Sequence, residues 1–261
     1  MPRLARDGLS DATRRLAAAG CLSPGDEAAE LAASARGDGE ALKALVERRV
    51  TGEPLAWITG KMEFCGCTVA VSRGVFVPRW QSEKLAARAA ELLPSRGRAI
   101  DLGTGSGAVA RVLLERHPDA AIIGTELDPV AAECARGNGV TVAQGDLFQA
   151  LPVSWKGTVD VIVAILPYVP TAEIAYLARD VRDFEPRSAL DGGEDGLRFV
   201  GRAVAEASDW LRAGGHLLLE IGGDQPTALI PALERASLTV VQVICDEDGD
   251  PRGIQAVRAS L

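Results

Sequence analysis

The sequence predicts an α/β protein with a mainly parallel sheet, preceded by a small helical domain. Three observations predict it: an Ala- and Leu-rich start to about residue 60, alternating strands and helices after Pro78, and a glycine-rich turn over 103–107. Strands separated by helical crossovers pair in parallel and carry helices on both faces. With 261 residues, the chain is long enough for one medium and one small domain.

Three regions follow one another along the chain. Residues 1–61 are predicted to form a helical domain, because apolar positions recur there at helix spacing. The alternating pattern from Met62 to Val77 predicts a β-hairpin linker over 62–78. Residues 79–261 are then the larger, catalytic domain.

The larger domain reads as strands joined by helices. Helices are expected over 82–93 and 107–116, on either side of the first strand. The expected strands cover residues 99–102, 121–126, 140–144, 159–165, 216–221 and 239–245. In an open sheet of this kind, ligands bind at the carboxyl ends of the strands.

A glycine-rich loop joins the first strand to the next helix. It contains Asp101, Gly103, Thr104, Gly105 and Gly107, and it opens the helix directly. Glycines at this place allow a tight turn in which the backbone comes close to a ligand. We therefore expect these five residues to bind a cofactor.

Acidic residues also end the next two strands. Glu126, followed by Leu127, lies 19 residues beyond the last glycine of the loop, which is the spacing of an acid that reaches ribose hydroxyls. Asp146 follows the third strand, where it can accept from the exocyclic amine of adenine while Leu147 or Phe148 packs near the ring. Together these residues predict a nucleoside site.

The acid before the first glycine favours S-adenosylmethionine over a nicotinamide dinucleotide. A carboxylate at Asp101 would repel a pyrophosphate, whereas it can make a charge-assisted contact with the cationic methionine end of S-adenosylmethionine. A sulfonium methyl group is already electrophilic, so the protein has mainly to orient a nucleophile. The sequence therefore predicts an S-adenosylmethionine-dependent methyltransferase.

Composition argues against several partners. The formal net charge is −8, and the 28 lysines and arginines are scattered rather than clustered, so we expect no nucleic-acid partner. Five cysteines without CxxC spacing and two histidines make a metal site unexpected. Nowhere do eighteen apolar residues run together, and no signal-peptide pattern is visible, so we expect a cytoplasmic protein without a membrane partner.

Longer runs of the sequence resemble the HemK-type protein-glutamine methyltransferases, which modify peptide-chain release factors. The resemblance covers nearly the whole chain and implies a seven-stranded, Rossmann-like class I methyltransferase sheet with an N-terminal substrate-docking domain. The runs that carry it are Arg48-Arg49, residues 52–60 (GEPLAWITG), 77–79 (VPR), 101–107 (DLGTGSG), 145–148 (GDLF), 182–187 (RDFEPR) and 189–197 (ALDGGEDGL).

The sequence departs from this family at the end of the fourth strand. The family has Asn-Pro-Pro-Tyr there, whose asparagine and following carbonyl accept hydrogen bonds from the target amide, but this chain has Ile165, Leu166, Pro167 and Tyr168. Ile165 offers no side-chain acceptor, and an unpaired buried N–H costs roughly 1 to 3 kcal/mol. We expect these four residues to be catalytic, with Pro167 and Tyr168 positioning the acceptor nitrogen and the backbone carbonyls beside them receiving its protons.

Two explanations of this departure compete: a weakened release-factor glutamine methyltransferase, or a pocket remade for another planar nitrogen. We favour the second, with the guanidinium of free arginine or a related small amino acid as acceptor. Carboxylates would hold such a cation, and Glu173, Asp183 and Glu185 follow the motif. Trp80 and Gln81 replace residues usual in the family, so we expect both to bind the substrate, and Trp80 could stack on a flat cation.

Two further classes remain open. A DNA amino-methyltransferase uses a related motif, but the acidic composition and the missing asparagine count against it. A catalytically decayed protein that still binds S-adenosylmethionine is the other alternative, because Ile165 removes an acceptor. The expected partner is thus a small amino-acid-type substrate or, in the alternative, a release-factor protein.

Overall fold

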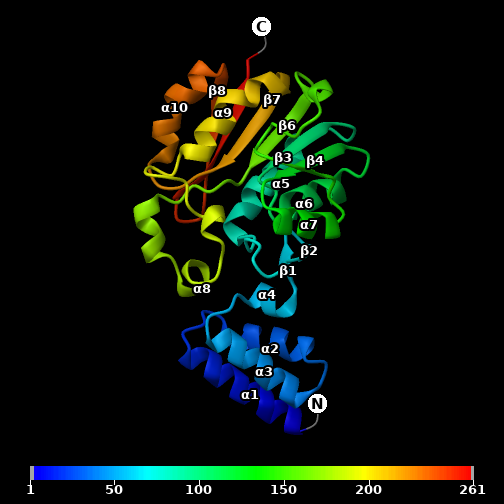
Figure 1. Ribbon diagram of the computed structural model, residues 1–261, viewed down its shortest axis with the longest axis vertical. Helices are drawn as coiled ribbons and strands as arrows, with labels where there is room; N and C mark the ends of the chain where they lie inside the picture. Colours follow the sequence, from blue (N-terminus) through cyan, green and yellow to red (C-terminus); the bar gives the residue numbers. More distant parts are fainter. Residues whose placement is uncertain (1–2, 260–261) are drawn as a thin grey trace.

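A bundle of helices opens the chain. The computed structural model describes residues 3–259, and its first elements are α1 (Arg3–Ala18), α2 (Pro24–Ser34), α3 (Gly39–Val50) and the short α4 (Leu55–Thr59). Figure 1 shows this bundle at one end of the molecule, joined to the rest through α4.

Apolar side chains on facing helices form the core of the bundle. Leu16, Leu31 and Val46, from three different helices, are buried against one another. Asp38 caps α3, since its carboxylate accepts from the backbone N–H groups of Glu40 and Ala41 at 2.9 and 3.2 Å. The helical pattern of the sequence therefore corresponds to one packed unit.

A hairpin leads from the bundle to the larger unit. Strands β1 (Lys61–Phe64) and β2 (Cys67–Ala70) pair antiparallel. The two residues between them, Cys65 and Gly66, have φ of +50° and +77°. Positive φ at both central residues is typical of the turns that close two-residue hairpins. The paired part is shorter than the alternating sequence pattern, because the chain after β2 turns away into a loop that leads to the 3-10 helix η1 (Trp80–Ser82).

The larger unit is a seven-stranded sheet, which confirms the predicted α/β class. The strand order is β5-β4-β3-β6-β7-β9-β8, parallel except for the pairs that β9 makes with β7 and β8. The strands are β3 (Arg98–Leu102), β4 (Ala121–Glu126), β5 (Val142–Gln144), β6 (Val159–Ala164), β7 (Leu211–Glu220), β8 (Leu238–Cys245) and β9 (Pro251–Arg258).

Helices cover both faces of the sheet (Figure 1). One face carries Ile100, Ile162 and Leu217, and the other carries Val161 and Val163, because successive residues of a strand point to opposite sides. Helices α9 and α10 cover the first face, and α5, α6 and α7 the second. The helices are α5 (Glu83–Leu92), α6 (Ala108–Arg116), α7 (Pro129–Gly137), α9 (Arg198–Trp210) and α10 (Gln225–Arg235).

Two parts of the sheet differ from the sequence-based expectation. Strand β9 was not expected, because it begins at a proline and follows an acidic turn that reads as a loop. Strand β7 begins at Leu211 rather than His216, and its register against β6 shifts between Val159 and Val161. The intervening Gly214 has a φ of +72°, which accommodates the irregularity.

No helix within residues 3–259 is both long enough and apolar enough to span a lipid bilayer.

Trp57 ties α4 to the loop after the hairpin. Its buried indole Nε1 donates a hydrogen bond of 2.9 Å to the carbonyl of Val75. Trp57→Phe would leave that carbonyl unpaired, so we expect the free energy of unfolding to fall by about 1 to 2 kcal/mol. Urea unfolding measures this, with Trp80→Phe as the control because the Trp80 indole is 66% exposed. Equal effects of the two substitutions would contradict the assignment.

Candidate active site

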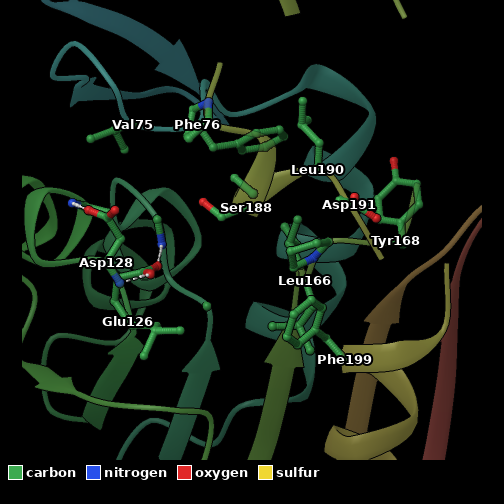
Figure 2. Close-up of a pocket in the computed structure, with 18 of the residues that line it drawn as sticks. Val75, Phe76, Glu126, Asp128, Leu166, Tyr168, Ser188, Leu190, Asp191 and Phe199 are labelled. Carbon is green, nitrogen blue, oxygen red and sulfur yellow. Dashed lines mark hydrogen bonds between the residues drawn. The ribbon is translucent and has the colours of Figure 1, made fainter. Parts of the chain in front are cut away.

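A cavity of about 820 Å³ opens at the carboxyl ends of the parallel strands. Figure 2 shows Glu126 and Asp128 on one side of it and Tyr168 and Asp191 on the other, with Leu166 between them. The first side is formed by the turns after β3, β4 and β5, and we call it the cofactor half. The second, formed by the segments after β6 and around residues 177–191, is the acceptor half.

The glycine turn after β3 forms the floor of the cofactor half. Gly103 has a φ of +67°, and a Cβ there would lie 2.8 Å from the Leu166 side chain. Gly107 is also left-handed, and a Cβ there would meet Val140 at 2.9 Å. Gly103 and Gly105 line the cavity, whereas Gly107 lies outside its lining and allows α6 to pack closely on α7 and the residues that follow it.

Asp101 lies beneath this turn and not in the cavity lining, which corrects its predicted contact with the cofactor. Its buried Oδ2 accepts from the hydroxyl of Thr104 at 2.6 Å and from the backbone N–H of Ala110 at 3.1 Å. The carboxylate therefore fixes the shape of the loop. Burial raises the pKa of Asp101 to about 6, although both hydrogen bonds oppose this shift. Thr104 likewise faces Gly124 and not the cavity.

Glu126 and Leu127 do line the cofactor half. The Glu126 carboxylate accepts from the backbone N–H of Gly105 at 2.9 Å and from that of Asp128 at 2.9 Å. A carboxylate can accept about four hydrogen bonds, so Glu126 retains capacity for ribose hydroxyls. Asp128 caps α7 through the N–H groups of Val130 and Ala131.

The turn after β5 is only partly as predicted. Asp146 and Leu147 line the cavity, and Asp146 is paired with Arg202 at 2.7 Å. Phe148 points away from it, because its ring stacks on Trp210 with a centroid distance of 5.4 Å. Of the two residues predicted to pack near adenine, the structure thus places Leu147 in the cavity and Phe148 in the core beneath α9.

The cofactor half fits a nucleoside sulfonium. Two glycines leave room against the floor, and Glu126 stands at the edge. The hydroxyl of Thr125 is buried in this lining and has no partner among the described residues, so a bound ligand can satisfy it.

The acceptor half begins at the tip of β6, and all four predicted catalytic residues line it. The carbonyl of Tyr168 accepts from Gln225 Nε2 at 2.8 Å. Gly192 and Gly196 let a loop lie against this segment, since a Cβ at either would come within 3.0 Å of a carbonyl of Pro167 or Tyr168. The corner formed by Pro167 and Tyr168 is thus held by Gln225 on one side and by the loop over residues 192–196 on the other.

A buried acid lies beside the Tyr168 ring. Glu220, at the tip of β7, is 4% exposed, and it lies against the Tyr168 phenol. Burial raises the pKa of both groups, and in Glu220 the nearby Arg252 and Arg79 oppose this. Glu220 was not among the predicted site residues, because its contact with Tyr168 joins distant parts of the chain.

The acids predicted to hold a substrate cation are not available for it. Glu173 and Asp183 lie outside the cavity lining, and Asp183 is paired with Arg182 at 2.8 Å. Glu185 is buried and forms an ion pair with Arg79. Burial raises the pKa of Glu185, which the Arg79 guanidinium opposes. The structure therefore does not bring these three acids together in the cavity, because two carboxylates pair with the chain's own arginines and the third faces solvent.

Trp80 is also misplaced by the sequence-based prediction. Its ring is largely exposed and does not line the cavity, whereas the neighbouring Gln81 does. Sequence reasoning missed the arginines of the acceptor half, because isolated arginines carry no pattern. They are Arg79, Arg187, Arg198 and Arg252.

Comparisons with known proteins show the family of the chain. A family model described as "Methyltransferase domain" matches residues 99–184. A release factor glutamine methyltransferase from Mycolicibacterium smegmatis is 36% identical over 99% of both chains. One from Moorella thermoacetica is 36% identical over 97% of this chain and 98% of that protein. The chain belongs to the HemK family.

HemK-family membership establishes the chemistry in outline. The chain is an S-adenosylmethionine-dependent methyltransferase, and S-adenosylmethionine is its cofactor. Solved structures agree on the fold: a methyltransferase from Pyrococcus furiosus has a TM-score of 0.53 at 19% identity, covering 74% of this chain and 90% of that one. A ribosomal protein L11 methylase from Lactobacillus delbrueckii subsp. bulgaricus has a TM-score of 0.52 at 16% identity, covering 74% and 86%.

The buried Asp101 carboxyl should make stability depend on pH. Its pKa is about 6 in the folded chain against an ordinary 3.8, so its contribution is fully present below 3.8 and is lost as pH rises through about 6. At about 1.4 kcal/mol per pH unit, the loss between about pH 3 and pH 7 is about 3 kcal/mol. Asp101→Asn should remove this component from urea unfolding curves. Identical pH profiles of the two proteins would contradict the assignment.

Glu126 should contribute directly to cofactor affinity. Glu126→Ala removes the acceptor at the edge of the cofactor half and the bond that holds Gly105, so we expect the Kd for S-adenosylmethionine to rise about tenfold or more. Isothermal titration calorimetry measures this. Glu133→Ala, at an exposed position of α7, is the matched control. Unchanged affinity in Glu126→Ala would refute the role.

Proposed function

We propose that this HemK-family enzyme methylates the side-chain amide nitrogen of a glutamine in a peptide-chain release factor. The observation that carries the proposal is its similarity over nearly the full length to proteins named release factor glutamine methyltransferase. The expectation of free arginine as the acceptor has no support from these relatives, whose names specify a release factor.

The charges of the acceptor half favour a neutral acceptor. Three acids near this half are already paired with arginines of the chain: Glu185 with Arg79, Asp246 with Arg252, and Asp191 with Arg187 at 3.1 Å. An added guanidinium would find no free carboxylate among these three, whereas a primary amide carries no net charge and needs none.

The tip of β6 can orient such an amide. Backbone carbonyls at Ile165 and Leu166 can accept its N–H groups, and the Tyr168 ring can pack against its plane. When bound, S-adenosylmethionine supplies an electrophilic methyl group. The residues of the chain then have to hold the amide nitrogen in line with it and keep water out.

We further propose that the helical unit, residues 1–61, docks the release factor. Arg49 on α3 pairs with Glu27 of α2 at 2.6 Å and with Asp180 of α8 (Arg179–Arg182) at 3.5 Å. The segment around α8 also contributes residues to the acceptor half. This link supports a protein that contacts the bundle while its glutamine enters the cavity.

Transfer of a radiolabelled methyl group tests the acceptor. We expect label in a release factor, and none when its target glutamine is replaced by alanine or when free arginine is offered instead. Label in free arginine would overturn the proposal. Calorimetric binding of S-adenosylmethionine without transfer to the release factor would also overturn it, in favour of a decayed enzyme.

A further inference from the structure

The acceptor half has to satisfy two N–H groups if its substrate is a primary amide. A desolvated N–H without a partner is costly, so the cavity needs two acceptors near the amide nitrogen. Carbonyls at the tip of β6 can supply one or both, but the side chain of Ile165 supplies none. A side-chain acceptor from another element would complete the site.

Besides the Thr125 hydroxyl of the cofactor half, two buried oxygens of the cavity lining have no hydrogen-bond partner within the part of the chain that the structure describes. They are Oε1 of Gln81 and Oε2 of Glu220. Unpaired buried acceptors are rare in folded proteins, and each calls for a donor. Both lie at the acceptor half, where a substrate brings N–H groups.

Their surroundings distinguish the two oxygens. The Glu220 carboxyl group lies against two hydroxyls of the protein, those of Ser82 and Tyr168, which can rotate to donate to it. Gln81 Oε1 makes no hydrogen bond with the described residues. We therefore take the amide oxygen of Gln81 as the acceptor that a substrate can serve.

The backbone holds Gln81 firmly in place. Its 3-10 turn is closed by a 3.0 Å hydrogen bond from Ser82 N to the carbonyl of Arg79. On one side Arg79 forms an ion pair with Glu185, and on the other Glu83 accepts from the N–H of Cys65 at 3.1 Å. The backbone that carries the Gln81 side chain into the cavity is therefore held on both sides.

We propose that Gln81 Oε1 accepts a hydrogen bond from the amide N–H of the substrate glutamine and so serves as the side-chain acceptor that Ile165 cannot provide. This inference rests on the proposed function. Gln81 orients the nitrogen and favours substrates with an N–H donor over those without one. It accepts a hydrogen bond and does not take the proton. The second N–H remains with the backbone carbonyls of the β6 tip.

Methyl transfer to a release factor tests this with three variants. Gln81→Leu should lower kcat/KM about tenfold or more, because one N–H is left unpaired. Gln81→Glu should stay within about threefold, since a carboxylate is still an acceptor. Adding Ile165→Asn to Gln81→Leu should restore most of the loss, since the new side chain offers an amide oxygen from the neighbouring strand tip.

The pattern of rescue separates positioning from folding. If Gln81 only stabilised the local structure, the loss in Gln81→Leu would persist after Ile165→Asn, and that result would overturn the inference. Gln242→Leu, at an exposed position of β8, is the matched control and should leave kcat/KM unchanged.

A binding measurement distinguishes failure of the inference from failure of the proposed function. If the natural chain does not label the release factor, propionamide is titrated by NMR into the protein saturated with S-adenosylhomocysteine. If propionamide binds more weakly to Gln81→Leu than to Gln242→Leu, Gln81 contacts a primary amide even though the release factor is not the substrate. Equal binding, or none to the natural chain, would overturn it.

Discussion

Two hydrogen bonds to the buried carboxylate of Asp101 hold the turn on which the cavity depends. They join the end of β3 to the start of α6 through Thr104 and Ala110. Glu126, from the neighbouring strand, holds the same turn from the other side through Gly105. Two acids that the sequence marks as ligands are therefore also parts of the scaffold, and only Glu126 faces the cavity as well.

Charge pairing organises the acceptor half in a similar way. Three arginines of this half form ion pairs within the chain: Arg79 with Glu185, Arg187 with Asp191, and Arg252 with Asp246, the last at 2.7 Å. Most of the charged groups around this half are therefore already paired. What remains unmatched is a pair of buried oxygens. A site with satisfied charges and free acceptors suits a neutral donor better than a cation.

The sequence predicted the fold and the cofactor half because both have local signals. Strand, glycine turn and helix are adjacent in the chain, and acids at strand ends can be read from spacing. The direction in which a side chain points cannot be read from spacing. Phe148 stacks on Trp210, and Glu185 pairs with Arg79 from a distant part of the chain. Strand β9 escaped prediction because its pairing with β7 and β8, not its own propensity, makes it a strand.

The doubly held corner at Pro167 and Tyr168 has an energetic consequence. Gln225 donates a hydrogen bond to the Tyr168 carbonyl, and the backbone at Gly192 and Gly196 packs closely against the same segment. The loss of conformational entropy at this corner therefore occurs when the chain folds, not when a substrate arrives. Binding energy from a docked partner then remains available to bring the reacting atoms into alignment.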